Sequence, residues 1–168
     1  MTLYAYSKIP INVLMSHEDV LWCTWYVNEV AKINPKARPD FLEAQKMCAL
    51  GFARAYGLMD EWKHKHSKIN IYPPFFDFEG HGHKLRIISV PMREDRNLGT
   101  ELRGRVFDKD YARGHTGYVL AGWYPPYVDI VGWMPRDEVI KYKGKWWYEL
   151  EESACKPMSS LRGYRLNM

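Results

Sequence analysis

Apolar side chains recur at helical spacing in residues 16–31, near the start of the chain. Tyr26 and Val30 continue a stripe along one face of a helix with 3.6 residues per turn. Ser16 is a residue type that caps helix N-termini, and Asp19 supplies the acidic partner of a capping box. The pattern predicts an amphipathic helix that begins at Ser16.

A second helix is predicted over residues 40–57, after prolines that interrupt the chain. Asp40 is expected to begin it, with Glu43 completing another capping box, and Gly57 is the expected stop. Phe41 belongs to its apolar stripe. Small residues on the same stripe would let the helix approach a sheet or another helix closely. These residues are Ala44, Ala49, Gly51, Ala53 and Ala55.

From residue 69 onward the pattern changes to short runs rich in β-branched and aromatic residues, separated by glycine and proline turns. A short helix is expected after Pro135, because proline favours the first helical position. The predicted strands cover residues 69–72, 75–78, 85–90, 102–107, 117–123, 128–133 and 145–150. Two helices followed mostly by strands predict an α+β (mixed α/β) fold, with a mixed sheet flanked by helices.

The length of 168 residues suggests a single domain, at roughly 150 residues per domain. We expect a helical part, residues 1–66, and a sheet-containing core, residues 67–168. No run of about 18 apolar residues and no signal-peptide pattern is found, so no membrane association is expected. The three cysteines are odd in number and widely spaced, which favours reduced thiols in the cytoplasm over a disulfide framework.

Basic residues are concentrated in the middle of the chain. The net charge is +4, and residues 61–115 carry +3 of it together with five of the six histidines. A long polar stretch, residues 91–114, lies in this segment, and loops of that length in compact domains are usually functional. Clustered cations favour a nucleic-acid partner, whereas an ordinary solvated surface with acidic partners is the alternative.

Arginine is suited to phosphate because its planar guanidinium makes bidentate hydrogen bonds. The central segment supplies several arginines, flanked by lysines. Acidic residues are interleaved with them, so internal ion pairing is the alternative. The expected phosphate-binding residues are Lys63, Lys65, Lys68, Arg86, Arg93, Arg96, Arg103 and Arg105.

Residues 117–139 (GYVLAGWYPPYVDIVGWMPRDEV) resemble the C-terminal half of small phage and prokaryotic nucleases of the PD-(D/E)XK, or restriction-endonuclease-like, superfamily. Residues 51–58 (GFARAYGL) occupy the place of its helix bearing a Gly-Glu pair. Residues 75–78 (FFDF) and 85–90 occupy the places of its two catalytic strands. The resemblance implies a restriction-endonuclease-like fold and an origin in a phage or mobile element, with the protein acting in the host cytoplasm.

In that superfamily, carboxylates at the ends of adjacent strands hold Mg²⁺, which activates a water molecule that a lysine orients. The resemblance places Asp77 at the first acid. Phe52 stands at the position of the helix glutamate, and Arg86 and Ile88 stand where the second acid and the lysine belong. The resemblance therefore implies a nuclease-like protein with a degenerate site and no cofactor. The basic central segment adds the expectation that it binds nucleic acid without cutting it.

An active Mg²⁺- or Mn²⁺-dependent endonuclease whose site has moved is one alternative. Asp77, Glu79 and Lys84 would then be catalytic, with Asp77, Glu79 and His81 as metal ligands on one strand face. For these residues we favour an exposed hairpin edge whose polar side chains face water. A second alternative is a pseudo-nuclease that binds a host or phage protein or builds a larger assembly, since a fold does not fix a function.

Aromatic residues make up 15% of the chain, so some rings are expected on a binding surface. Trp123, Tyr124, Tyr127 and Trp133 could stack on bases. We favour the core for these four, because members of the superfamily that the chain resembles keep bulky residues there for packing.

Overall fold

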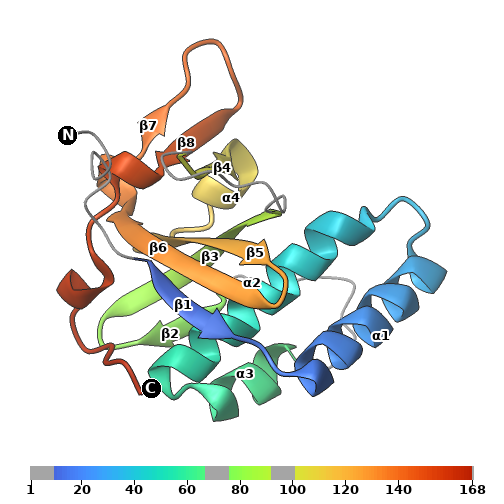
Figure 1. Cartoon of the computed structure of the whole chain (residues 1–168). Helices are drawn as coiled ribbons and strands as arrows, with labels where there is room; N and C mark the ends of the chain where they lie inside the picture. The colour runs from blue at the N-terminus through green and yellow to red at the C-terminus, as the bar shows by residue number, and fades with distance from the viewer. Residues whose placement is uncertain (1–9, 67–75, 92–100, 168) are drawn as a thin grey trace.

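The computed structural model describes residues 10–66, 76–91 and 101–167 (Figure 1). Helices and strands are mixed along these residues, which confirms the predicted α+β class. The α-helices are α1 (His17–Ile33), α2 (Pro39–Tyr56), α3 (Met59–His66) and the single-turn α4 (Asp108–Tyr111). The strands are β1 (Ile11–Leu14), β2 (Phe78–Gly80), β3 (His83–Pro91), β4 (Arg103–Phe107), β5 (Gly117–Tyr124), β6 (Tyr127–Pro135), β7 (Ile140–Lys141) and β8 (Trp147–Glu151).

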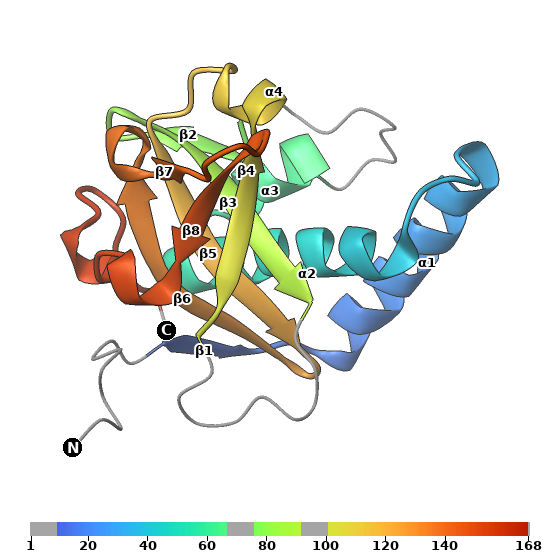
Figure 2. The ribbon, with the colours of Figure 1, turned by 90° about the horizontal axis from the view of Figure 1, so that it is seen from above.

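Five strands form the main sheet in the order β1-β6-β5-β3-β2. Strands β3 and β5 are parallel, whereas the other neighbours in this sheet are antiparallel. The remaining three strands form a second, antiparallel sheet in the order β4-β8-β7, which lies over one face of the main sheet (Figure 2). The connection from β3 to β5 runs through β4 and α4, so this crossover carries the first strand of the second sheet.

The main sheet is buried on both faces. Ile87 of β3 and Val119 of β5 belong to the core cluster on the helix side, with side chains of α1 and α2. Their neighbours Ile88 and Leu120 belong to the cluster on the side of the second sheet. Successive residues of a strand point to opposite faces, so two covered faces explain why β5 is an unbroken apolar run. The fold therefore has three layers: helices, main sheet and second sheet.

Helix α1 begins with the predicted capping box. The Ser16 hydroxyl accepts a hydrogen bond from the backbone N–H of Asp19 at 3.1 Å, and the Asp19 carboxylate accepts one from the backbone N–H of Ser16 at 3.1 Å. Asp19 also accepts from Nε and Nη2 of Arg54 on α2, at 2.9 and 2.5 Å. One carboxylate therefore caps α1 and joins it to α2.

Helix α2 begins at a different residue from the one that its capping pattern predicts. Arg38 is the N-cap and Pro39 takes the first helical position, so Asp40 already lies inside the helix. The predicted capping box of Asp40 and Glu43 is therefore wrong. Glu43 instead accepts a hydrogen bond from Nε1 of Trp123 on β5 at 3.2 Å, which fastens α2 to the sheet.

The small residues of α2 let it lie directly on the sheet, as predicted. A Cβ atom at Gly51 would come within 2.8 Å of the Val128 side chain on β6, which is closer than carbon atoms pack. The predicted end of the helix is also confirmed. Gly57 follows the last turn with a φ of 69°, in the left-handed region that favours glycine.

Strands β3, β4, β5, β6 and β8 confirm five of the predicted strands, with small differences at their ends. Strand β2 begins only at Phe78, and the predicted strand over residues 69–72 lies outside the described residues. The helix expected after Pro135 is a single 3-10 turn, Arg136–Glu138. The sequence pattern misses β1, which pairs with β6 and adds a strand to the part of the chain expected to be helical.

The cysteines Cys23, Cys48 and Cys155 are buried free thiols, as expected. Burial raises the pKa of Cys23 and of Cys48 to about 12. Because the thiolate is the reactive form, these two side chains are inert at neutral pH. Within the described residues, no helix has the length and apolar character needed to span a bilayer.

Candidate nucleic-acid interface

Asp77 is buried where the chain enters β2. Its side chain is 3% exposed, and its backbone N–H donates to the carbonyl of Leu85 at 2.9 Å. Its Oδ2 accepts from the backbone N–H of Ile87 at 2.7 Å, and its Oδ1 lies 3.8 Å from Arg86 Nη1 and 3.8 Å from His66 Nε2. The carboxylate therefore holds β2 against β3 and faces cationic or protonatable groups.

Lys46 brings another cation to this buried cluster from α2. The residue is 5% exposed, and its Nζ lies 4.6 Å from the centroid of the Tyr26 ring. Burial lowers the pKa of Lys46 to about 8, although the charge of Asp77 acts in the opposite direction. Burial also lowers the pKa of His66, again opposed by Asp77. The cluster thus contains one carboxylate among Lys46, His66 and Arg86.

The proposed metal ligands Asp77, Glu79 and His81 do not converge. The Glu79 side chain is 47% exposed and lies 3.2 Å from Lys65 Nζ, whereas His81 packs edge-on against Tyr164 with ring centroids 5.3 Å apart. Across residues 10–66, 76–91 and 101–167, no three His, Cys, Asp or Glu side chains form a group that could hold a metal ion.

The expected shared face of Asp77 and Glu79 requires a strand that includes both residues. Strand β2 begins at Phe78, and Asp77 lies in a bend, so its side chain turns inward while that of Glu79 points to solvent. Lys84 is the cross-strand partner of Glu79, and its Nζ lies 5.1 Å from the Phe76 ring centroid. The trio of Asp77, Glu79 and Lys84 is therefore divided between the interior and the surface.

The predicted phosphate-binding residues differ in their surroundings. Lys65 lies 3.4 Å from Glu61 as well as near Glu79, and Arg103 lies 3.4 Å from Glu101 and 3.8 Å from Glu149. Internal ion pairing, the alternative, therefore applies to Lys65 and Arg103. Lys63 and Arg105 are exposed, and Arg86 is 9% exposed. Lys68, Arg93 and Arg96 lie outside the described residues.

A groove of about 360 Å³ opens between the start of α2 and strands β3 and β4. Arginines from these three elements line it, namely Arg38 at the N-cap of α2, Arg86 on β3 and Arg105 on β4. Asp110 also lines the groove, and its carboxylate lies 3.3 Å from Arg113 Nη1. The groove therefore combines several cations with one acid that has its own cationic partner.

Arg38 and Phe41 are groove residues that the sequence does not reveal. Arg38 belongs to residues 1–60, which carry no net charge, rather than to the basic central segment. Phe41 is expected on the apolar stripe of α2. In the structure Phe41 is 45% exposed, and the Arg38 guanidinium lies 4.3 Å from its ring centroid. Arg38 also lies 4.0 Å from Asp40, but both side chains are exposed, so water screens this ion pair.

The favoured core position of the aromatic residues near the β5–β6 turn is confirmed for Trp123 and Trp133, which are 4% and 8% exposed. The indole Nε1 of Trp133 donates to the hydroxyl of Ser160 at 2.9 Å. The well-exposed rings lie elsewhere and include Phe107 on β4 and Trp146 just before β8. The sequence misses both, because its base-stacking candidates are limited to residues 123–133.

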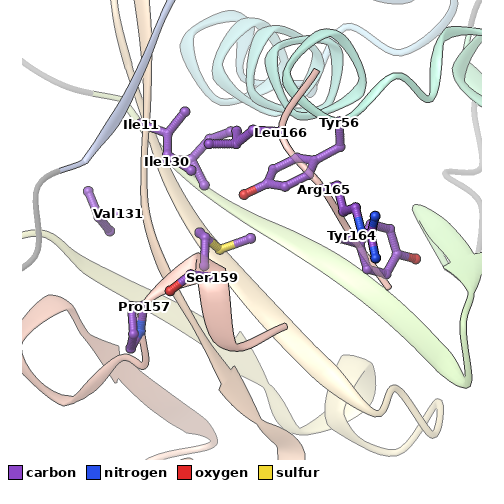
Figure 3. A pocket seen from close by; sticks show the side chains of 10 residues that line it. Ile11, Tyr56, Ile130, Val131, Pro157, Ser159, Tyr164, Arg165 and Leu166 are labelled. Atoms are coloured by element: carbon purple, nitrogen blue, oxygen red, sulfur yellow. The ribbon is translucent and has the colours of Figure 1, made fainter. Parts of the chain in front are cut away.

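A larger pocket of about 710 Å³ lies between β1, β6 and the C-terminal segment (Figure 3). Apolar side chains such as Ile11, Ile130 and Leu166 dominate its wall, and the Tyr56 hydroxyl points into it. Arg165 is the one charged side chain among its lining residues within the described chain. The groove lined by Arg38, Arg86 and Arg105, which we call the arginine groove, is therefore the better match for a polyanion.

Comparisons of the chain with protein-family models, with curated proteins and with solved structures find no match. The resemblance to the PD-(D/E)XK superfamily therefore stays a prediction from the sequence.

Proposed function

We propose that this protein binds nucleic acid without cutting it, and that the phosphates of the nucleic acid bind along the arginine groove. The observation that carries the proposal is that Arg38, Arg86 and Arg105 line one groove although they come from three separate elements. Guanidinium groups bind phosphate oxygens through paired N–H donors, and release of counterions from the nucleic acid adds to the affinity.

The buried cluster favours a binding role over a nuclease role. A nuclease metal needs several oxygen ligands that face the phosphate. Asp77 is instead nearly sealed from solvent and faces Arg86 and His66, while Glu79 points away. A metal ion beside Asp77 would meet the positive charge of Arg86, which occupies the position where the resemblance predicts an acid.

Binding at two salt concentrations tests the proposal. We expect the protein to bind a fluorescent oligonucleotide at low salt and to lose affinity steeply between about 50 and 200 mM salt, because phosphate contacts release counterions. Arg38→Gln and Arg105→Gln should each lower the salt slope by roughly 0.7–0.9. Arg162→Gln is the matched control, since Arg162 is exposed and lies outside the groove. Absence of binding at low salt would reject the proposal and favour a host or phage protein as the partner.

Plasmid DNA with Mg²⁺ or Mn²⁺ tests the nuclease alternative. The proposal predicts no cutting by the wild-type protein with either metal. Cutting that is lost in an Asp77→Ala protein that circular dichroism shows to be folded, and that is retained in Arg162→Gln, would establish the nuclease instead. The phage origin and the cytoplasmic location remain predictions from the sequence.

A further inference from the structure

The β7–β8 hairpin projects from the second sheet (Figure 1). Exposed aromatic rings lie at its turn. Trp146 is 64% exposed and Tyr142 is 50% exposed. The turn is closed by a hydrogen bond from the Lys145 backbone N–H to the Tyr142 carbonyl at 3.0 Å, and Gly144 within it has a φ of 74°. The backbone therefore holds these rings at the surface in a defined geometry.

Strand β4 contributes a further ring to this group. Phe107 stacks on Trp146 with ring centroids 5.2 Å apart and an interplanar angle of 27°. The backbone N–H of Asp108 donates to the Trp146 carbonyl at 3.0 Å, which fixes the end of β4 beside the turn. Tyr142 stacks on Trp147, with ring centroids 6.1 Å apart. We call the four rings, Phe107, Tyr142, Trp146 and Trp147, the stacking platform.

Cations border the stacking platform. The Arg105 guanidinium lies 4.4 Å from the Trp147 ring centroid, and Lys145 Nζ lies 5.6 Å from it. Glu149 stands opposite Arg105 in the β4–β8 pair, but its carboxylate lies 3.8 Å from Arg103. Among the residues that the structure describes, neither Arg105 nor Lys145 has a carboxylate within 4.0 Å. The charge beside the rings therefore suits a polyanion.

The platform and the arginine groove are continuous. Arg105 and Phe107 line the groove and also contact Trp147 and Trp146 of the platform. A nucleic-acid backbone that follows the groove past Arg105 would therefore carry its bases to the exposed rings. Every base has a flat π face, so stacking on aromatic side chains tolerates any sequence.

We propose that the stacking platform binds unpaired bases, so that the preferred ligand is single-stranded nucleic acid. This inference rests on the proposed function and names its class of ligand. Phe107 covers one face of Trp146, and the large exposed fraction of this indole leaves room for a base on it. Bases inside a duplex already stack on each other and cannot lie flat on a protein surface ring.

Anisotropy titrations with labelled oligo-dT of about 15 nucleotides, and with a duplex of equal length, test this inference. Trp146→Ala should weaken binding to oligo-dT by about 5- to 150-fold, the effect of losing one stacked base, and should leave duplex binding unchanged. Trp146→Phe keeps a stacking ring and should retain most of the affinity. Trp25→Ala is the matched control, because Trp25 on α1 is 48% exposed and lies apart from the platform.

The salt dependence separates this inference from the proposed function. Trp146→Ala removes no charge, so it should leave the salt slope at the wild-type value, whereas Arg105→Gln lowers the slope. Equal binding of oligo-dT and duplex with no effect of Trp146→Ala would overturn the stacking inference but keep the phosphate groove. Equal weakening of both ligands by Trp146→Ala would overturn it too. No binding of either ligand at low salt would reject both proposals.

Discussion

The Asp77 carboxylate and the Arg86 guanidinium face each other in the interior, with Oδ1 and Nη1 3.8 Å apart and side chains 3% and 10% exposed. Asp77 lies where β2 begins and Arg86 lies on β3, so the pair joins adjacent strands, and Arg86 also lines the arginine groove. At this site the superfamily that the sequence resembles would place a metal ion. Here a fixed guanidinium supplies positive charge instead, and the carboxylate contributes to stability.

Asp77→Asn should therefore reduce the free energy of unfolding strongly. The change removes the carboxylate that faces the buried cations Arg86 and Lys46, and breaking a buried ion pair from one side costs roughly 3–5 kcal/mol. Urea unfolding followed by circular dichroism measures the loss. Glu79→Gln is the control, and because Glu79 is partly exposed it should change stability by only about 0.5 kcal/mol. Unchanged stability of Asp77→Asn would contradict the structural role of the pair.

Lys46 should make stability rise with pH. The unfolded chain keeps the lysine proton up to about pH 10.5, whereas burial lets the folded chain release it near pH 8. Between these values the unfolded state holds more protons, so the free energy of unfolding increases with pH, by roughly 3 kcal/mol in all. Below pH 8 both states are protonated and the full cost of burying the charge remains.

A comparison with Lys46→Met isolates this effect. Cys23 and Cys48 oppose it above about pH 9 in both proteins, because their raised pKa values make the folded state hold more protons. Lys46 lowers the pKa of Cys23, so Cys23 opposes it slightly more in Lys46→Met, which changes the difference in the same direction. The stability of wild type minus that of Lys46→Met should increase from pH 8 to 10.5. Urea titrations at several pH values measure it, and a flat difference would show that Lys46 keeps an ordinary pKa in the folded protein.

Gly51→Ala should destabilise the protein although alanine favours helices. The new Cβ would lie within 2.8 Å of Val128, and crowding in a well-packed core costs roughly 1–3 kcal/mol. In a Val128→Gly background the three contacting atoms, Cβ, Cγ1 and Cγ2 of Val128, are all absent, so Gly51→Ala should stabilise that protein by about 1 kcal/mol through helix propensity. Thermal unfolding of the four proteins forms a double-mutant cycle. The same sign of effect in both backgrounds would contradict the close contact.

Asp19→Ala should weaken the protein more than the loss of an ordinary helix cap. The change removes the reciprocal capping bond to Ser16 and also the paired hydrogen bonds from Arg54. A cap is worth about 1 kcal/mol and hydrogen bonds to charged groups about 1.5–3 kcal/mol. Glu18→Ala, an acidic neighbour in the same first turn, is the control. Similar urea midpoints for the two variants would show that the Arg54 contact adds nothing.

The sequence predicts the helices and long strands well, because their periodicity is set by burial on one or both faces. Short elements are missed because they bury too few side chains to produce a periodic pattern. Strand β1 has one buried side chain, that of Val13, and α3 has too few apolar positions to form a stripe. Helix α2 begins before Asp40 because Pro39 takes the first helical position. Proline lacks a backbone N–H, but at this position the N–H would have no partner within the helix, so no hydrogen bond is lost.

The candidate site is less predictable because it depends on contacts between distant segments. Arg38 and Arg105 line one groove because α2 packs on β3, and no local pattern in the sequence predicts this arrangement. Asp77 and Glu79 follow strand alternation in the sequence, but the bend at Asp77 turns one carboxylate inward. Trp146 is recognisable as a surface ring only once β8 is paired with β4.

The pairing of β4 with β8 also has a consequence for protein synthesis. Strand β4 forms one wall of the arginine groove, yet its hydrogen-bonded neighbour β8 is synthesised only after β5, β6 and β7. A ribosome-bound polypeptide that has not yet released β8 lacks both the support for this wall and the ring of Trp147. A nascent chain should therefore acquire the proposed affinity for nucleic acid only after β8 has left the ribosome.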